Sequence, residues 1–153
     1  FDFKYGAKIY SQTNLLLYEY GLHKATLEGR EGGVIGKGVT EDGKTNTKSV
    51  NAQIYYTDLA SGSNYITEEF VYDASFIKLR SLSLTYSLPQ KLLGKTFIKG
   101  ASLSLVGRNL AILMKHTPNI DPESELNSTN GQGLELSGYP PVRNLGFNLN
   151  LKF

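Results

Sequence analysis

The sequence lacks several residue types on which functional sites are often built. It has no cysteine and no tryptophan, and it has two histidines and one methionine among 153 residues. Without cysteine the chain has neither a disulfide framework nor a thiolate metal site. His23 and His116 have no second metal ligand or catalytic partner at a recognisable spacing, so we expect both at the surface. No Ser/His/Asp signature is present either, and the sequence therefore does not indicate an enzyme.

Long apolar runs and a strong charge of either sign are also missing. The longest apolar stretches, around 14–18 and 110–114, are far shorter than the ~20 residues of a membrane-spanning helix. The net charge is +2, from 16 Lys and Arg against 14 Asp and Glu. This balance gives no electrostatic reason to expect nucleic acid or an acidic membrane surface as a partner. At 40% hydrophobic residues, the chain is too apolar to be disordered.

The N-terminus lacks the features that begin a secreted protein. The segment 1–5, FDFKY, has no initiator methionine, no basic region and no continuous apolar region. It already alternates between aromatic and charged residues, as a strand does. We therefore expect the chain to be the downstream piece of a longer protein.

Alternation with a period of two is the main signal in the sequence, and it predicts β-strands. Four segments show it: about 1–10, 76–88, 100–112 and 143–153. The last is the most regular, with the apolar positions Leu145, Phe147, Leu149, Leu151 and Phe153 alternating with Asn144, Gly146, Asn148, Asn150 and Lys152. Pro89 ends the second strand because proline has no ladder donor, and 89–94 is predicted to form one helical turn.

The connections between these strands are unequal in length. Two long loops are predicted, at about 11–74 and 113–142, against one short turn after Pro89. Within the first loop, 13–24 favours a helix of about three turns that Gly21 breaks. The segment 27–46 is rich in glycine, and 50–74 has no clean period, which is typical of a partly ordered loop with aromatic anchors.

Three features favour strands that face lipid. The last strand has eleven residues, against the ~9–11 that cross a bilayer and the ~5–6 of an average soluble strand. The polar faces carry Ser, Thr, Asn and Gly with few charges, which suits the lumen of a barrel. Short turns on one side and long loops on the other are typical of outer-membrane barrels. A half-buried strand in a soluble sandwich also alternates, and this alternative stays open.

Four strands are too few to close a membrane barrel. The smallest such barrels have about eight strands, because an open edge in lipid leaves backbone groups unpaired. The chain is therefore expected to be a fragment, or to associate with the missing strands.

Several sequence blocks occur in a fixed order along the second half of the chain. They are 73–89 (DASFIKLRSLSLTYSLP), 105–110 (LVGRNL), 119–123 (NIDPE), 138–143 (GYPPVR) and the final aromatic strand. In these blocks and their spacing the chain resembles the C-terminal region of SusC/RagA-like TonB-dependent transporters. The upstream segments 14–21 (NLLLYEYG) and 39–43 (VTEDG) are similar to extracellular loops of that family, although less diagnostically.

The resemblance implies an all-β fold in which this chain supplies the C-terminal antiparallel strands of a barrel of about 22 strands. Such barrels sit in the outer membrane of Gram-negative bacteria and contain an N-terminal plug. They work beneath a SusD-like surface lipoprotein and import oligosaccharides or, in some members, peptides, driven by the TonB complex. The plug and the TonB box are absent from this sequence, and no cofactor is implied.

Two further motifs have simpler interpretations. The segment 38–45 (GVTEDGKT) satisfies the phosphate-binding pattern G-x-x-x-x-G-K-[ST], but that pattern requires a preceding buried strand and a following helix. Neither is indicated here, and Glu41 and Asp42 would repel phosphate, so we predict a turn. The carboxylates of Asp121, Glu123 and Glu125 alternate in a loop, but they lack the spacing and the glycine of a calcium-binding loop. We therefore expect no metal.

Tyrosine is the most informative residue type in the loops. The chain has ten tyrosines, and our candidates for substrate contact are Tyr18, Tyr20, Tyr55, Tyr56 and Tyr65. Their rings can stack on sugars while their hydroxyl groups form hydrogen bonds, or they can pack the loops together or contact the lid. Tyr86, near a strand end, is predicted to be an aromatic residue at the membrane interface.

Two functional hypotheses from different classes follow. The first is an outer-membrane importer, of which 143–153 is a lipid-facing strand. The second is a soluble β-rich carbohydrate-binding module, in which Leu145, Leu149 and Phe153 face a protein core.

Overall fold

The computed structural model describes residues 1–61, 66–94, 96–124 and 131–153. Tyr65 and Glu125, both named above, lie outside these ranges. The chain separates into two compact units. We call Phe1–Ala7, Ala74–His116 and Pro140–Phe153 the strand unit, and Lys8–Asp73 with Thr117–Tyr139 the loop unit.

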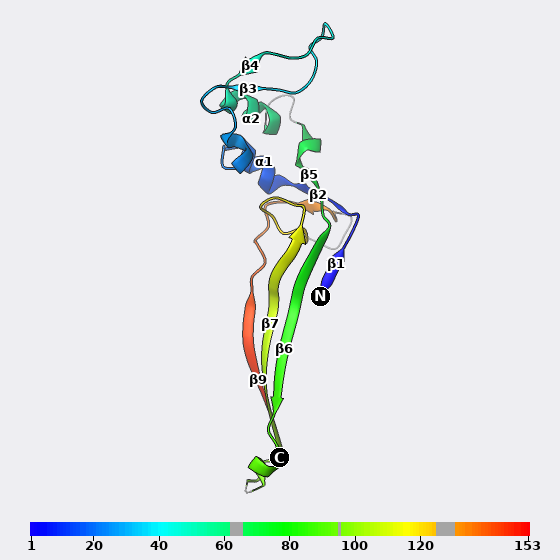
Figure 1. The fold of residues 1–153 in the computed structure, drawn as a ribbon, viewed down its shortest axis with the longest axis vertical. Helices are drawn as coiled ribbons and strands as arrows, with labels where there is room; N and C mark the ends of the chain where they lie inside the picture. Colours follow the sequence, from blue (N-terminus) through cyan, green and yellow to red (C-terminus); the bar gives the residue numbers. More distant parts are fainter. Residues whose placement is uncertain (62–65, 95, 125–130) are drawn as a thin grey trace. The chain divides into compact units, whose positions relative to one another are not determined.

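The strand unit is one antiparallel sheet with the strand order β1-β6-β7-β9. Its strands are β1 (Asp2–Lys4), β6 (Phe76–Ser87), β7 (Gly100–Lys115) and β9 (Asn144–Lys152). Figure 1 shows β6, β7 and β9 running side by side as long strands. These three lie where the sequence predicts the strands 76–88, 100–112 and 143–153.

The predicted first strand, about 1–10, is wrong in extent. β1 covers three residues, and a separate strand, β2 (Lys8–Ser11), belongs to a different sheet. Gly6 lies between them with a φ of +80°, a conformation that glycine adopts at little cost and that ends an extended strand.

Strand β7 is longer than predicted because it contains two bulges. Its pairing with β6 shifts between Ile77 and Lys78 and again between Leu79 and Ser81, and each shift places an additional β7 residue opposite β6. Asn109, at the second shift, has a φ of +54°, and its side chain donates to the backbone carbonyl of Val142 at 3.1 Å. A bulge reverses the phase of the alternation. This explains why the sequence around 110–114 is apolar without a clean period.

A short turn joins β6 to β7. It contains α3 (Gln90–Leu93), with Pro89 before it and Gly94 just past its end. The predicted helical turn after Pro89 is therefore confirmed. Figure 1 places this turn and the C-terminus at the same end of the sheet.

The loop unit contains short elements around a small core. Its helices are α1 (Gln12–Glu19), η1 (Lys24–Leu27), α2 (Ala52–Ala60) and η2 (Thr67–Phe70). Strand β2 pairs with β5 (Val71–Asp73) and with β8 (Leu134–Glu135), while β3 (Val34–Ile35) pairs with β4 (Ser49–Val50).

Two predictions for the loop unit need correction. The predicted helix 13–24 ends earlier, at Glu19, because Gly21 has a φ of +67° and the chain turns there into η1. The predicted loop 50–74 contains α2, whose N-cap Asn51 accepts hydrogen bonds from the amides of Gln53 and Ile54. A capping side chain of this kind supplies an acceptor for amides that the helix leaves unpaired.

The core of the loop unit is built from α1, α2 and η2. Its buried members are Leu15, Tyr18, Ala52, Tyr56, Ala60 and Phe70. The α2 members recur every four residues, so one face of the helix packs against α1. The rings of Tyr18 and Phe70 meet edge to face, with centroids 5.3 Å apart, an arrangement that aromatic pairs favour.

Strands predominate over helices in the described residues, and the predicted all-β class is confirmed at that level. Among these residues we find no helix with the length and apolar content needed to cross a membrane.

Candidate functional site

The strand unit presents one continuous apolar face. In the register of β6, β7 and β9, Leu84 is opposite Leu105, and Leu105 is opposite Phe147. In the adjacent row, Tyr86 is opposite Leu103, and Leu103 is opposite Leu149. These six side chains are between 43% and 75% exposed, so no other described part of the chain covers the face. We call the face made by these two rows the apolar face.

The opposite face of the sheet carries small polar side chains. Thr85, Ser104 and Asn148 form one row, and the hydroxyl groups of Thr85 and Ser104 are 2.9 Å apart. Small hydroxyl and amide groups of this kind can face water or one another without a charged partner. The sheet therefore has one surface suited to an apolar medium and one suited to a polar medium.

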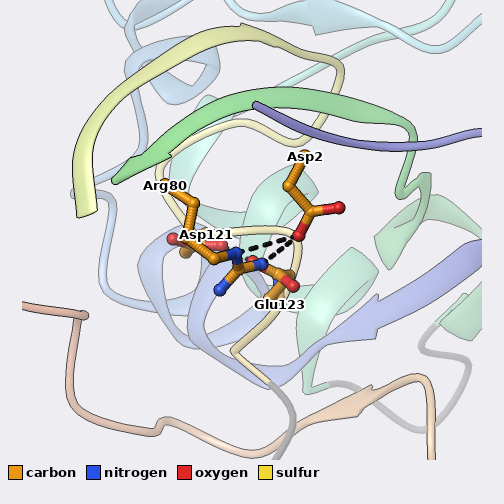
Figure 2. Close-up of polar contacts among 4 residues, drawn as sticks. All are labelled: Asp2, Arg80, Asp121 and Glu123. Atoms are coloured by element: carbon orange, nitrogen blue, oxygen red, sulfur yellow. Dashed lines mark hydrogen bonds and ion pairs between the residues drawn. The ribbon is translucent and has the colours of Figure 1, made fainter. Parts of the chain in front are cut away.

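Charged groups on the sheet gather near β1. The Arg80 guanidinium donates from Nε to the Asp2 carboxylate at 2.9 Å, and its Nη2 donates to the same oxygen (Figure 2). Because both side chains are partly exposed, solvent screens this pair and its contribution to stability is small. It fixes β1 against β6 rather than forming a reactive centre.

Two edges of the sheet have no partner strand among the described residues. β9 pairs with β7 on one side, and β6 pairs with β1 only over residues 76–78. Edge backbone groups are hydrogen-bonding sites that another strand can satisfy.

The loop unit contains an open groove of about 610 Å³ between the end of α1, η1 and the start of α2. Its lining residues are Tyr18, Glu19, Tyr20, Gly21, Leu22, Thr26, Arg30, Asn51, Ala52, Gln53, Tyr56 and Thr57. We call it the tyrosine groove. The polar groups of Arg30, Asn51 and Gln53 on its walls were not singled out from the sequence. Asparagine is a favoured N-cap residue, so Asn51 could have indicated from the sequence that a helix begins there.

The structure distributes the predicted tyrosines unevenly. Tyr18, Tyr20 and Tyr56 line the tyrosine groove, while Tyr55 lines a separate hollow beside Gly36. Tyr18 and Tyr56 are buried members of the core, and the Tyr56 hydroxyl donates to the carbonyl of Ala25 at 3.0 Å. Tyr20 is 68% exposed, so its ring is the most accessible aromatic surface in the groove.

Arg30 holds one wall of the groove in place. Its Nε donates to the Thr26 carbonyl at 2.8 Å, and its Nη2 donates to the Gly21 carbonyl at 2.5 Å and to the Thr26 hydroxyl at 3.1 Å. A guanidinium fixed in this way loses little further entropy when it binds a ligand. The groove therefore combines an aromatic surface with preorganised polar groups.

Burial favours the protonated, neutral form of the two buried tyrosines in the groove. Desolvation raises the pKa of Tyr18, and negative charge from Glu69 adds to the rise. Desolvation also raises the pKa of Tyr56. Both phenols stay neutral at physiological pH, so they can donate hydrogen bonds but cannot act as bases. The groove is arranged for binding rather than for proton transfer.

A buried polar network joins three separated segments of the loop unit. The carboxylate of Glu135 on β8 accepts from the Ser11 hydroxyl at 2.7 Å, the Thr13 hydroxyl at 2.6 Å and the Thr13 amide at 3.1 Å. Asn14 donates to the carbonyl of Pro118 at 3.0 Å, and Asn119 donates back to the Asn14 side chain at 2.9 Å. The network thus connects the sequence blocks 14–21 and 119–123.

The remaining motifs have local structural roles. In the segment 38–45, the Thr40 amide donates to the Lys44 carbonyl at 2.8 Å and Val39 bridges to Thr45, so the predicted turn is confirmed. Asp121 accepts from the Glu123 amide at 2.8 Å. The described residues contain no group of three metal-ligating side chains.

The histidines differ from each other in their environments. His116 is exposed, as predicted. His23 is half-buried rather than at the surface, because its ring packs on Tyr18 with centroids 4.6 Å apart. Its Nδ1 accepts from the Ala25 amide at 3.1 Å and caps η1. Neither residue belongs to a catalytic arrangement in the described part of the chain.

Two curated proteins of Formosa agariphila are similar to the chain. One, named TonB-dependent receptor P3, is 38% identical over 94 residues, which cover 58% of this chain and 9% of that protein. The other, TonB-dependent receptor P26, is 34% identical over 89 residues, or 55% of this chain and 9% of that protein. The match thus spans about one eleventh of the length of each relative. No family model matches the chain.

Solved structures share the fold. The chain aligns with a structure of the RagAB peptide transporter at a TM-score of 0.60 and 21% identity, over 99% of this chain and 15% of that chain. It aligns with the RagAB peptide importer in an "open-open" state at a TM-score of 0.56 and 23% identity, over the same shares. The arrangement of strands, helices and loops described above therefore also occurs within a much longer chain.

Proposed function

We propose that this chain, which is related to TonB-dependent receptors, forms part of the barrel wall of an energy-coupled transporter in the outer membrane. The observation that carries the proposal is the strand unit's exposed apolar face, backed by a face of small polar side chains. In a barrel wall the first surface contacts lipid and the second faces the lumen. The similar proteins are named as receptors and transporters, which supports this class over an enzyme.

The energetics of the apolar face argue for an apolar environment. Moving one Leu or Phe side chain out of water is worth about 1.5–3 kcal/mol, and the two rows of the face together hold six large side chains. In water, this surface would promote aggregation unless another protein layer covered it. The described residues of the strand unit supply no such layer, because the hydrophobic core cluster lies wholly in the loop unit.

The open strand edges fit the same proposal. A membrane barrel leaves no edge unpaired, because each unsatisfied backbone group in lipid costs several kcal/mol. The free sides of β6 and β9 would therefore pair with strands from the rest of the barrel, which in the family that the sequence resembles has about 22 strands and an N-terminal plug. Coupling to the TonB complex would act through that plug.

The tyrosine groove is our candidate for substrate contact. An accessible aromatic ring beside fixed guanidinium and amide groups suits an oligosaccharide, because sugars present an apolar ring face and many hydroxyl groups. A peptide could use the same groups through its backbone, and the RagAB relatives are described as peptide transporters. In the working transporter, a SusD-like surface lipoprotein would form the lid over the loops.

The test of function uses the full-length protein. The purified transporter is screened by calorimetry against defined oligosaccharides and peptides, and cells that carry it are screened for growth on each ligand. We expect Tyr20→Ala to weaken binding about 5- to 150-fold. This range is the effect of removing one aromatic side chain that stacks on a nucleic-acid base, applied here by analogy to a ring that stacks on a ligand. Tyr139→Ala is the matched control, because Tyr139 is a fully exposed loop tyrosine outside the groove.

Two outcomes would contradict the proposal at different levels. Equal effects of the two tyrosine substitutions would remove the groove from the binding site but leave the transporter intact. A full-length protein that is monomeric and folds cooperatively in water without detergent would exclude a membrane barrel. That result would favour the soluble carbohydrate-binding module instead.

A further inference from the structure

Exposed lysines lie at the end of the sheet where β6 turns into β7. Lys91 lies in α3, and Lys99 immediately precedes β7. Two hydrogen bonds hold this region together: the Lys99 amide donates to the Lys152 carbonyl at 2.7 Å, and the Gln90 side chain donates to the Lys99 carbonyl at 3.5 Å. Both Lys91 and Lys99 are exposed.

Exposed apolar side chains surround these lysines. Leu92 is 68% exposed, Phe97 is 79% exposed and Phe153 is 65% exposed. The rings of Phe97 and Phe153 stack with centroids 5.7 Å apart and an angle of 11° between their planes. Stacked rings, an exposed leucine and lysines together form an amphipathic border of the kind found at membrane–water interfaces. We call Lys91, Leu92, Phe97 and Lys99 the lysine rim.

The rim has no acidic side chain with which to neutralise its charge. The sequence has no Asp or Glu from residue 74 to residue 120, and none from residue 136 onward. The single acidic side chain of the strand unit, Asp2, belongs to β1 and bonds Arg80. Within the described residues, neither Lys91 nor Lys99 has an ion-pair partner. An anion from outside the chain would therefore complement this surface.

We propose that the lysine rim binds the headgroups of anionic phospholipids at the border of the apolar face. This inference rests on the proposed function, since the apolar face must lie in a bilayer for the rim to reach its surface. The acyl chains would cover Leu103 and Leu149, and the Phe97 ring would lie at the level of the headgroups. Lys91 and Lys99 would extend their ammonium groups to the phosphate, as long side chains do near a membrane surface.

The geometry also separates Lys99 from its neighbour Lys152. Lys152 follows Leu151, an apolar-face residue, so alternation assigns Lys152 to the polar face. Lys99 immediately precedes β7, and the alternation continued back from Ala101, which pairs with Leu151, would place it toward the apolar side. The two lysines are joined by a backbone hydrogen bond, but the proposal places their side chains toward different surfaces. Lys99 should contact lipid headgroups and Lys152 should not.

Native mass spectrometry of the detergent-purified full-length protein tests the proposal. The probes are phosphatidylglycerol, zwitterionic phosphatidylethanolamine and lipid A, each titrated separately. We expect the double variant Lys91→Gln with Lys99→Gln to bind phosphatidylglycerol about 25-fold more weakly, since each lysine near an anionic surface contributes roughly fivefold. Binding of phosphatidylethanolamine should be unchanged. If the preference for phosphatidylglycerol over phosphatidylethanolamine falls as the salt concentration is raised, the interaction is electrostatic.

Matched variants control for net charge. The pair Lys24→Gln with Lys48→Gln removes two exposed lysines from the loop unit and should leave phosphatidylglycerol binding unchanged. Lys99→Gln alone should weaken binding several-fold more than Lys152→Gln alone. Equal losses in all these variants, or a stronger preference for lipid A than for phosphatidylglycerol, would overturn the proposal.

A separate measurement keeps this proposal distinct from the proposed function. A nitroxide label is placed at Phe147 through a Phe147→Cys substitution in the full-length protein reconstituted into liposomes, and its accessibility to oxygen and to a water-soluble nickel complex is compared. Greater accessibility to oxygen places the apolar face in lipid, so unchanged lipid binding by the rim variants would then overturn the headgroup proposal alone. Greater accessibility to nickel would overturn the proposed function as well.

Discussion

The two units place their aromatic residues in opposite environments. Phe70 in the loop unit has no exposed surface, whereas Phe147 in the strand unit is 75% exposed. Phe70 gains stability from packing against Tyr18 and its neighbours within the same chain. Phe147 has no such partners among the described residues. The loop unit thus has its own core, while the described strand unit is joined by ladder hydrogen bonds and, under the proposed function, would be covered by lipid.

Charge divides between the units in the same way. The strand unit has ten lysines and arginines and one acidic side chain, while the loop unit has six against thirteen. The net charge of the chain is therefore small because a basic strand unit and an acidic loop unit offset each other. A basic surface that borders an apolar face suits anionic lipid headgroups, whereas an acidic surface would repel them. The difference between the units suggests different neighbours for each.

The largest expected effect tests whether the loop unit depends on its own core. Phe70→Ala should destabilise the packing of α1 and α2 by about 3–5 kcal/mol, the usual cost of removing a buried ring. Hydrogen exchange measured by mass spectrometry on the full-length protein should show lost protection in both helices. Protection of β7 and β9 should be unchanged, because their partners lie in the strand unit.

Phe3→Ala is the control for this substitution. Phe3 is 79% exposed on β1, so its removal leaves no cavity. If Phe70→Ala left α1 and α2 as protected as Phe3→Ala does, the loop unit would not have an independent core.

The second prediction compares the two faces of the strand unit at neighbouring positions. Phe147→Arg should lower the free energy of unfolding in lipid bilayers by about 2–4 kcal/mol, as arginine does on the lipid side of a barrel. Asn148→Arg, on the polar face, should change it by less than about 1 kcal/mol, because the lumen of a barrel tolerates charge. Urea titrations of the full-length protein in vesicles would measure both. A larger effect at Asn148 would reverse the assignment of the faces.

These contrasts also explain which parts of the fold could be predicted. The strands 76–88, 100–112 and 143–153 were identifiable because alternation along a strand is a local property. The bulge at Asn109 was not, because it depends on pairing with β6. α2 was missed because its buried positions, Ala52, Tyr56 and Ala60, include two alanines, which carry a weak apolar signal.

The candidate site was less predictable for a related reason. The parts of the tyrosine groove come together through contacts between separated residues, such as the Tyr56 hydroxyl with the Ala25 carbonyl, which are 31 positions apart. No local pattern in the sequence reports such a pairing. The lysine rim was hidden differently, because the net charge of +2 averages over both units. Positions in the fold, rather than composition, revealed it.

The third prediction concerns a buried carboxylate of the loop unit, for which the strand unit has no equivalent. Glu135→Gln should destabilise the start of α1 by about 1–3 kcal/mol, because an amide cannot accept from Ser11 and Thr13 at both of its polar atoms. Glu41→Gln, on the exposed turn, should have no measurable effect. Hydrogen exchange of the Thr13 and Asn14 amides is the measurement. Unchanged exchange there would mean that the network does not hold the helix.

The smallest expected effect is a pH dependence confined to the loop unit. Burial lowers the pKa of His23 below its usual value of 6.5, so the folded state binds a proton less readily than the unfolded chain does. The neutral ring also accepts from the Ala25 amide, and protonation removes this acceptor. The contribution of His23 is therefore fully present above the unfolded pKa and is lost as pH falls below about 6.5.

A substitution that keeps the cap should remove this pH dependence. In His23→Asn, a side-chain oxygen can take over as acceptor without titrating in this range, since asparagine is a favoured N-cap residue. Hydrogen exchange over η1, corrected for intrinsic rates, should then fall in protection between pH 7.5 and pH 5 in the wild type but not in the variant. The ladder of β7 and β9 should show no such change in either protein. An equal loss in both units would mean that a group other than His23 controls the response, and the two units would then respond to acid as one.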